Sequence, residues 1–469
     1  MASLLIQQQE YTKIDLIIRS GTVIDPSNNI HGKHDLIISN GKIVDIIPQA
    51  TSAQLASATT TYDATDCYVT PGLIDIHAHI YQYATPLGVD PDTTCLSRGV
   101  TTVVDAGSSG ASTFPGLRKY IKETSTTRVL SFIHICMHGL ASAGCSGFGK
   151  GGELDSLNQV NEEWATQCIE DNSDMVVGVK IRLSADCAND GANEMEAYRR
   201  ARAVTTKTNK PLIVHHTFSS IPHQGANGAL GGLKSGDIYT HALHGFPSSI
   251  IQVETKDSSN TKSYQVCAAA KEARKRGVLF DVGHGAGSFS WSVAEICASQ
   301  SFFPDTISTD LHVESCGGSN CDKIDLCIAM SKMLHVGMEL MEVVRAVTAT
   351  PARAIGFDHC IGALTKGYLA DITILKKHDC NSLVEDCQGQ KRFMKETIRA
   401  VAVFKNGIQY PVTFPTLKCE VNQYPGAEER WKQLIVRDEV APNWNDTEGS
   451  GEDVESDGSE PLSKKNYHR

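Results

Sequence analysis

Eight apolar runs in the middle of the chain limit the folds that this sequence can adopt. The runs cover residues 68–79, 101–107, 128–135, 175–183, 211–216, 237–244, 278–285 and 306–312. Helical or loop segments such as 194–207 and 263–276 separate them. A strand that is apolar on both faces must be buried on both faces, which is typical of parallel sheets covered by helices. Eight such strands alternating with crossovers predict an α/β fold, the closed (β/α)8 TIM barrel.

Short strands are predicted on both sides of the barrel segment. β-branched stretches fill much of residues 14–47. Between two of them, Asn40-Gly41 fits a two-residue hairpin turn, because both positions tolerate positive φ. Strand-like segments return at 372–375 and 401–407, so the two ends of the chain are expected to pair in one small sheet domain.

The chain therefore divides into four predicted parts. These are a composite β-sandwich domain from residues 1–67 and 355–420, the barrel at 68–354, a helical segment at 421–442 and an acidic tail at 443–469. The tail holds seven acidic side chains against three basic ones. A segment of this polarity cannot bury enough apolar surface to fold, so we expect it to be disordered.

Charge and cysteine usage exclude several classes of protein. The formal net charge is −11, so the chain has no overall basic field that would attract nucleic acid or an anionic membrane. The N-terminus lacks the features of a secretory signal, and no run approaches the roughly 18 apolar residues of a membrane span. The 15 scattered cysteines do not resemble a secreted disulfide framework. We expect a soluble, cytoplasmic protein with reduced thiols, and neither nucleic acid nor membrane as a partner.

Metal-type ligands lie at the ends of several predicted strands. His77 and His79 end the first run, and residues two apart on a strand point to the same face. The further candidates are Lys180 on the fourth run, His215-His216 on the fifth, His241 and His244 on the sixth, His284 on the seventh and Asp310 on the eighth. Catalytic groups of TIM barrels project from these strand ends, so the pattern indicates a metal centre there.

Two of these positions leave alternatives open. Lys180 lies among apolar residues, where its amine either reaches out to solvent or is desolvated with a lowered pKa. A neutral amine can add CO₂ to give a carbamate that bridges two cations. His215 and His216 point to opposite faces of their strand, so only one of them can face the metals.

The motifs resemble the amidohydrolase superfamily of binuclear metal hydrolases. Within its dihydroorotase-like branch they are most similar to the amidohydrolase/deacetylase metallohydrolase family. The similar segments are PGLIDIHAHIY at 71–81, GVTTVVDAGSSG at 99–110, GVKIR at 178–182, GDIYTH at 236–241, FDVGHGAGSFS at 280–290, ISTDLH at 307–312, TATPARAIG at 348–356 and GALTKGYLADI at 362–372. The resemblance extends from about Ile14 to Asn406.

The resemblance implies a role for each ligand candidate. His77, His79 and Asp310 would hold the first of two divalent ions, His215 and His241 the second, and carbamylated Lys180 would bridge both. Zinc suits histidine-rich ligands, while the carboxylate and the carbamate also suit Mn or Co. Asp310 would in addition act as the catalytic base that takes a proton from the attacking water and passes it to the leaving group.

Two further residues are candidates for substrate binding. Arg182 shares a strand face with Lys180, and its guanidinium either binds a substrate carboxylate or pairs with a carboxylate of the barrel. His284 lies between Gly283 and Gly285, which allow close approach of a ligand. It is either a hydrogen-bond donor to substrate or a structural histidine.

The predicted function is metal-dependent hydrolysis of an amide or ester bond. The resemblance implies a small acylated substrate, an N-acyl amino acid or an O-acyl hydroxy acid from which the acetyl group is removed. One alternative is a cyclic amidase of the dihydroorotase or hydantoinase type, which would open a ring. The other is a catalytically inactive scaffold on the same fold, which would be expected to lack several of the six ligands. A homo-oligomer is compatible with each of these functions.

Overall fold

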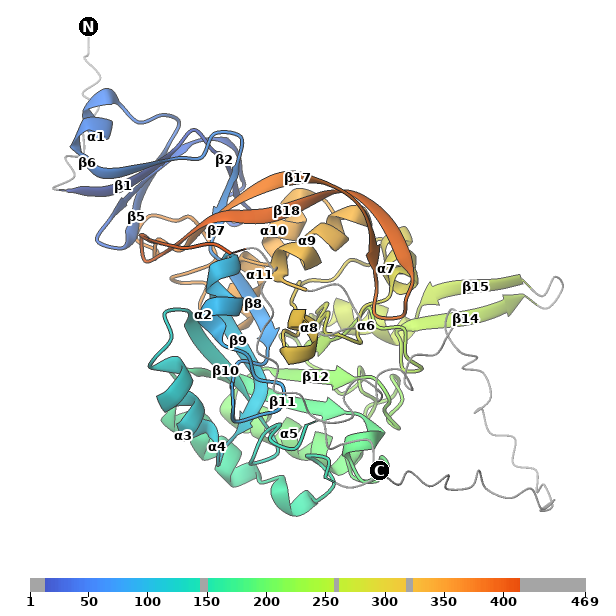
Figure 1. Ribbon diagram of the computed structural model, residues 1–469. Helices are drawn as coiled ribbons and strands as arrows, with labels where there is room; N and C mark the ends of the chain where they lie inside the picture. The colour runs from blue at the N-terminus through green and yellow to red at the C-terminus, as the bar shows by residue number, and fades with distance from the viewer. Residues whose placement is uncertain (1–12, 144–150, 257–260, 318–323, 414–469) are drawn as a thin grey trace, which may run out of the picture.

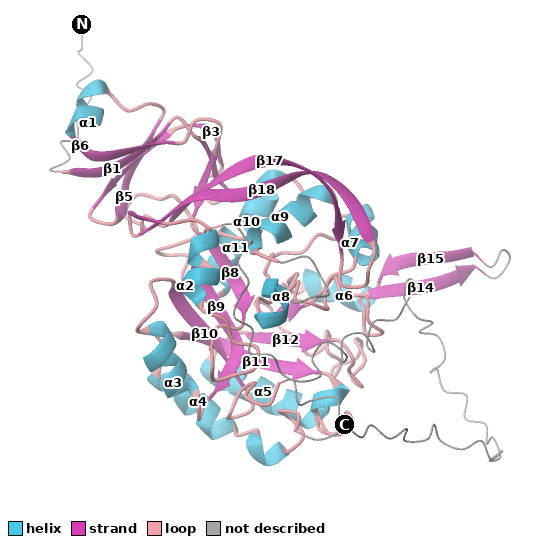
Figure 2. Cartoon of the chain, in the orientation of Figure 1, coloured by secondary structure: helices cyan, strands magenta, loops and turns pink. Residues whose placement is uncertain are grey.

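The protein is described by a computed structural model over residues 13–143, 151–256, 261–317 and 324–413. The helical segment predicted at 421–442 and the acidic tail predicted at 443–469 lie outside the described residues. Within the described part, the chain forms one large parallel sheet with helices around it, two smaller sheets beside it and a separate two-stranded hairpin (Figures 1 and 2).

The large sheet has seven parallel strands in the order β16-β13-β12-β11-β10-β9-β8. They are β8 (Leu73–Ala78), β9 (Val100–Gly110), β10 (Arg128–His134), β11 (Val176–Leu183), β12 (Leu212–His216), β13 (Ile238–Thr240) and β16 (Leu279–Phe280). Every residue of β8 and β9 is buried. Burial on both faces explains why these strands are continuous apolar runs in the sequence.

The last three predicted barrel strands are shorter in the structure than in the sequence-based prediction. The sixth and seventh runs form only the three residues of β13 and the two of β16. His241 has φ +60°, and Gly283 and Gly285 have φ +48° and +53°. These left-handed conformations turn the backbone out of the extended ladder, so both strands end early.

The eighth predicted run contacts both outer strands of the large sheet. Thr306 forms a parallel bridge to Asp281, next to β16, and Leu311 forms one to Ala78 of β8. The backbone N–H of Asp310 donates to the carbonyl of His77. The segment therefore carries Asp310 to the end of the first strand, although it forms single bridges rather than a regular strand.

Strands from the two ends of the chain are joined in a six-stranded sheet of order β19-β18-β17-β7-β2-β3. Its members are β2 (Thr22–Asp25), β3 (Ile30–Lys33), β7 (Tyr68–Pro71), β17 (Ile372–Glu385), β18 (Lys391–Lys405) and β19 (Ile408–Tyr410). The first predicted barrel run thus divides between β7 in this sheet and β8 in the large one. Gly72 lies at the division, where a Cβ would come within 2.3 Å of the Thr101 hydroxyl oxygen.

A four-stranded sheet of order β5-β4-β1-β6 completes the N-terminal region. It contains β1 (Ile14–Arg19), β4 (Asp35–Ser39), β5 (Lys42–Ile47) and β6 (Ala58–Asp63), with α1 (Ser52–Ser57) between the last two. Ser39 pairs with Lys42, and Asn40 and Gly41 have φ +50° and +70°. The predicted two-residue turn is therefore confirmed.

The remaining helices follow the strands of the large sheet. They are α2 (Pro91–Thr94), α3 (Phe114–Leu117), α4 (Glu162–Asp171), α5 (Glu194–Thr208), α6 (Ala268–Lys275), α7 (Trp291–Ser299), α8 (Val313–Gly317), α9 (Leu326–His335), α10 (Leu340–Ala346) and α11 (Ala349–Ala354). Among the described residues, none of the helices has both the length and the apolar character that crossing a membrane requires.

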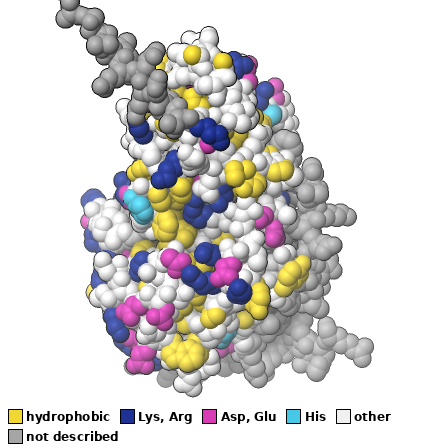
Figure 3. All heavy atoms as spheres, turned by 90° about the vertical axis from the view of Figure 1, so that its left-hand side faces the viewer, with side chains coloured by type: hydrophobic (Ala, Val, Ile, Leu, Met, Phe, Trp, Pro, Cys, Tyr) yellow, Lys and Arg dark blue, Asp and Glu magenta, His cyan; other side chains and the backbone are white. Residues whose placement is uncertain are grey.

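The long β17–β18 ribbon joins the small sheets to the rim of the large one. Figure 1 shows it arching over α9 and α10 and reaching α7. At its tip the Asp386 carboxylate accepts the backbone N–H of Trp291, and the indole N–H of Trp291 donates to the carbonyl of Val384. A second hairpin, β14 (Ile251–Lys256) with β15 (Thr261–Val266), projects beyond the sheet. The face drawn in Figure 3 carries basic, acidic and apolar side chains interspersed.

Candidate metal centre

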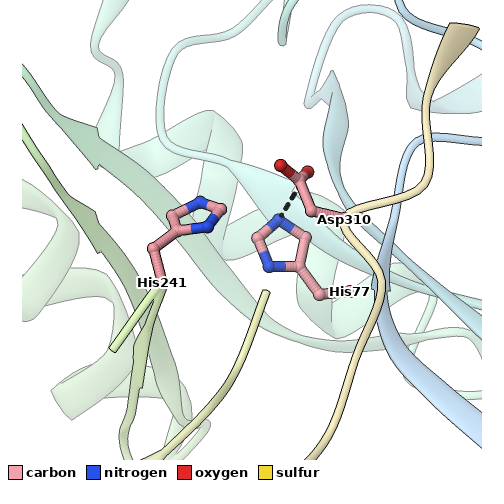
Figure 4. A group of neighbouring side chains, drawn as sticks. All are labelled: His77, His241 and Asp310. Atoms are coloured by element: carbon pink, nitrogen blue, oxygen red, sulfur yellow. Dashed lines mark ion pairs between the residues drawn. The ribbon is translucent and has the colours of Figure 1, made fainter. Parts of the chain in front are cut away.

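Three side chains from distant parts of the sequence converge at the carboxyl ends of the strands. His77 ends β8, His241 follows β13, and Asp310 lies in the segment that bridges the sheet edges. One ligand atom from each lies within 4.8 Å of the others, and the three side chains face one another (Figure 4). All three are nearly excluded from solvent. Such a group of imidazoles and a carboxylate is typical of a site for a divalent cation.

The other predicted ligands are contiguous with this group. Asp310 Oδ1 lies 3.3 Å from Nε2 of His77 and 3.0 Å from Nε2 of His79. The amine of Lys180 lies 3.0 Å from Nε2 of His77. The ring centroid of His241 lies 5.0 Å from that of His77 and 4.3 Å from that of His215. The structure therefore brings all six ligand candidates into one cluster.

Hydrogen bonds fix which nitrogen of His77 faces the cluster. The hydroxyl of Thr240 donates to Asp281, with 2.7 Å between Oγ1 and Oδ2. Because its only proton is used there, Thr240 Oγ1 must accept from His77 Nδ1, 2.8 Å away. His77 is thus protonated at Nδ1, and the lone pair of Nε2 points toward Asp310 and Lys180. A buried carboxylate orients a metal ligand in this way in many metal sites.

We expect Thr240→Val to weaken metal binding about 10–100-fold, because it removes the acceptor that orients His77 without changing the size of the side chain. Isothermal titration of metal-free protein with Zn²⁺ measures the affinity. Thr306→Val is the matched control, since the Thr306 hydroxyl also donates to Asp281, at 2.7 Å, yet contacts no predicted ligand. Equal losses in both variants would contradict a specific role for Thr240.

The orientations of His241 and His79 are fixed in a similar way. Nδ1 of His241 lies 2.7 Å from the carbonyl oxygen of Gly283, which can only accept, so the lone pair of Nε2 is left for the cluster. Nδ1 of His79 lies 3.0 Å from the hydroxyl of Ser108. Both His241 and Asp310 adopt left-handed backbone conformations, with φ +60° and +46°. Strain of this kind in residues other than glycine is concentrated at functional sites.

His215, not His216, faces the cluster. Nε2 of His215 lies 2.8 Å from the hydroxyl of Thr217. Nδ1 is therefore the ring nitrogen that remains to bind a metal. His216 is on the other side of the strand, with its nitrogens 3.0 Å from the hydroxyl of Tyr239 and 2.8 Å from the carbonyl of Ile221. The opposite orientation of the two neighbours follows from the alternation of side chains along a strand.

Lys180 is buried, with only 2% of its surface exposed. Burial lowers its pKa to about 8, against the opposing effect of Asp310 and Asp281. Its stem passes Gly107, where a Cβ would lie 2.8 Å from both Cβ and Cγ of Lys180. The amine does not extend to solvent, so of the two interpretations open from the sequence, the structure has the desolvated one.

Electrostatics at the cluster favour neutral imidazoles and an ionised carboxylate. Burial holds the pKa of His77 well below its usual value, and the nearby Lys180 adds to this effect. Burial likewise lowers the pKa of His241 to about 4. Burial alone would raise the pKa of Asp310, but His77, His79 and His241 together bring it well below the usual range. Unprotonated imidazoles and a carboxylate are the forms that bind metal, so the donor set fits divalent cations.

The two predicted substrate residues have protein partners. The guanidinium of Arg182 donates to both oxygens of the fully buried Glu153, at 2.5 and 2.8 Å. This is the barrel carboxylate pairing that the sequence left as one alternative. His284 Nδ1 lies 2.8 Å from the carbonyl of Gly285, and its Nε2 lies 2.9 Å from the amine of Lys332. The carbonyl can only accept, so Nδ1 carries the ring proton and Nε2 accepts from Lys332. This supports the structural role of His284 rather than donation to a substrate.

Several residues around the cluster were not among the sequence candidates. Thr240 and Asp281 orient His77, Glu153 holds Arg182, and Lys332 contacts His284. Thr240 directly precedes His241, and Lys332 is a lone cation on an apolar helix, so both carried a weak signal. Glu153 lies in a glycine-rich loop and carried none.

The chain is similar to known proteins over most of its length. The model of the Amidohydrolase family matches residues 68–408. A deacetylase of Agrobacterium fabrum is 32% identical over 360 residues, which cover 77% of this chain and 82% of that protein. The crystal structure of an adenine deaminase has a TM-score of 0.72 at 27% identity, covering 85% of this chain and 100% of that one. The crystal structure of a dihydroorotase has a TM-score of 0.70 at 26% identity, with 85% and 99% covered.

Proposed function

Because the chain belongs to the amidohydrolase family, we propose that it is a binuclear metal-dependent hydrolase that deacetylates a small N-acyl amino acid or O-acyl hydroxy acid. Membership of this family and the similarity to a deacetylase identify the protein as a hydrolase that acts on carbon–nitrogen bonds. The deacetylase relative supports the acetyl group as the part that is cleaved. The observation that carries the proposal is the contiguous cluster of six ligand candidates around His77, His241 and Asp310.

The cluster supplies two ligand sets in this proposal. His77, His79 and Asp310 hold one divalent cation, His215 and His241 hold the second, and carbamylated Lys180 holds both. Zinc is the first choice for so many imidazoles, with Mn or Co as alternatives. When bound, the cations would lower the pKa of a water and polarise the acyl carbonyl.

Side chains of the protein transfer the proton and orient the metal ligands in this proposal. Asp310 is ionised and within 3.3 Å of two imidazole nitrogens, so it is placed to take the proton from the attacking water and return it to the leaving amine or alkoxide. Thr240 and Asp281 keep His77 in the Nδ1-protonated form. Arg182, two residues beyond Lys180, is held by both oxygens of the buried Glu153, so we propose a structural role for it beside the site.

A substrate screen tests this function. The holoenzyme is assayed with acetylated D- and L-amino acids and hydroxy acids, with dihydroorotate and hydantoins in parallel, and Asp310→Asn serves as the blank. Turnover of an acetylated acid that the blank lacks supports the proposal. Turnover of the cyclic compounds alone would replace it with the cyclic amidase, an alternative favoured by the similarity to a dihydroorotase structure. Fewer than about one metal equivalent and no turnover would favour the inactive scaffold.

The pKa of Lys180 predicts how carbamate formation depends on pH. In the metal-free protein only the neutral amine reacts, R–NH₂ + CO₂ giving R–NH–COO⁻ and H⁺. With a pKa of about 8, about a tenth of the amine is neutral at pH 7 and about nine tenths at pH 9. Reconstitution with Zn²⁺ at constant dissolved CO₂ should therefore be several-fold faster at pH 9, as measured by recovery of activity. A rate that does not change between these pH values would contradict the carbamate.

We also propose that the parallel sheet closes into the predicted barrel, with residues 306–311 as its eighth strand. The single bridges of Thr306 and Leu311 to the two sheet edges support closure. The predicted sandwich of residues 1–67 and 355–420 is supported by one apolar core that both small sheets share, with Leu16 and Leu36 from one and Val69 and Phe404 from the other.

A further inference from the structure

His134 ends β10 at the same level as Lys180. The two residues are register partners on neighbouring parallel strands, so their side chains point to the same side of the sheet. Gly107 lies on β9, the neighbour of β10 on its other side, and the side chains of Lys180 and His134 both pack near it. A Cβ at Gly107 would lie 2.8 Å from Lys180 Cβ and 3.3 Å from His134 Cδ2. His134 is therefore in the inner layer that carries the ligand cluster.

The protonation state of the His134 ring follows from one hydrogen bond. The backbone N–H of Cys136 donates to His134 Nδ1 over 3.0 Å. A backbone amide is only a donor, so Nδ1 must be unprotonated and the ring proton must be on Nε2. His134 thus presents an N–H group, where His77 and His241 present lone pairs.

That N–H group has no hydrogen-bond partner among the described residues, although the side chain is fully buried. A buried donor without a partner destabilises the folded protein, because it has lost its hydrogen bond to water. Nε2 is bonded to Cδ2, the ring atom that lies closest to a Cβ built on Gly107, and the stem of Lys180 contacts the same position. The donor is therefore directed along the side of the site where Lys180 and His79 lie, and it is suited to an oxygen that arrives with a ligand.

We propose that the Nε2–H of His134 donates a hydrogen bond to the acyl oxygen of the substrate as that oxygen gains negative charge. The inference rests on the proposed function for the identity of the oxygen. Its place at the level of Lys180, one of the proposed ligands, favours the reacting group over the remainder of the substrate. A preorganised donor aimed at developing charge stabilises the transition state more than the ground state.

Two substitutions separate this role from a structural one. In His134→Asn the amide oxygen takes the position of Nδ1 and still accepts from Cys136, but no donor reaches the position of Nε2. In His134→Gln the longer side chain restores a donor at that position. His138→Asn is the control, since His138 is partly exposed and contacts the Cys136 thiol rather than the cluster.

The first measurement is steady-state kinetics of the holoenzyme, with metal content and melting temperature for each variant. We expect His134→Asn to lower kcat about 10²-fold with little change in KM, two metal equivalents retained and partial recovery in His134→Gln. His138→Asn should match the wild type. A kcat within threefold of wild type, a change in KM alone, or loss of metal from His134→Asn would each overturn the proposal.

The second measurement separates the inference from the proposed function. Acetohydroxamate, a small acyl anion, is titrated into the zinc-loaded wild type and His134→Asn. We expect at least about tenfold weaker binding in the variant. If the wild type cleaves no acetylated acid yet shows this difference, the donor role stands and the substrate class is wrong. If the wild type does cleave one and both proteins bind the probe equally, the function stands and the inference about His134 fails.

Discussion

Asp310→Asn is expected to lower kcat on the best acetylated substrate by about 10³-fold or more. The carboxylate lies between His77 and His79, with Oδ1 3.3 and 3.0 Å from their Nε2 atoms. General acid–base catalysis contributes about 10²–10⁴-fold, and asparagine has the size of aspartate but cannot accept the proton. The substitution also removes a charged metal ligand, because the amide oxygen of asparagine binds a cation more weakly than a carboxylate does.

The charge state of Asp310 determines whether the residue can act as a base or as an acid. Burial favours the protonated carboxyl group, but His77, His79 and His241 lower its pKa well below the usual range. The group is therefore ionised near neutral pH and can accept a proton there. Substitution removes this base rather than an acid, so raising the pH should not restore the variant.

Metal analysis of the same sample separates the two roles of Asp310. A variant that retains both equivalents and loses kcat has lost the base, and one that loses an equivalent has lost the ligand. Asp171→Asn, at the exposed end of α4, is the matched control and should retain full activity. A kcat of Asp310→Asn within tenfold of wild type would contradict the assigned role.

The large sheet was predictable because its strands are buried on both faces. The runs that became β8 to β12 are mainly apolar, with their polar residues gathered toward the strand ends, and this pattern needs no knowledge of tertiary contacts. The later strands were overestimated, because β13 and β16 end at Thr240 and Phe280, and the left-handed conformations of His241 and Gly283 that follow them leave no mark in an apolar pattern. The 14 and 15 residues of β17 and β18 were underestimated for a related reason. Their outer parts are largely exposed and polar, so no apolar pattern marks them.

The ligand candidates were predictable because each lies at the end of a predicted strand. The residues that orient these ligands were not predictable. Thr240 and Asp281 form a hydrogen-bonded chain to His77 across the sheet, and spacing along the sequence does not show such contacts. The same limit applies to Arg182. Its pairing with Glu153 brings together a strand end and a loop residue 29 positions away. His134 shows the limit most clearly, because only the hydrogen bond from Cys136 distinguishes its donor nitrogen from the acceptors of the other histidines.

Lys180→Met is expected to remove at least one of two metal equivalents and to lower kcat about 10³-fold. Methionine fills nearly the same buried volume, so the change removes the amine and little of the packing against Gly107. Without the amine, the carbamate proposed to join the two ligand sets cannot form. Loss of a cation removes several kcal/mol of transition-state stabilisation, and each 1.4 kcal/mol is about a tenfold change in rate.

Lys332→Met is the control for Lys180→Met, because it replaces another buried lysine that is not a predicted metal ligand. Lys332 is also buried, with 1% of its surface exposed, but its amine contacts His284 and the carbonyl of Glu385, 2.9 and 3.1 Å away, rather than the six ligand candidates. This control should lower the melting temperature and retain both metal equivalents. If Lys180→Met also retains both, measured by inductively coupled plasma mass spectrometry after gel filtration, Lys180 is not a bridging ligand. The buried amine would then act only as a hydrogen-bond donor to Nε2 of His77, 3.0 Å away.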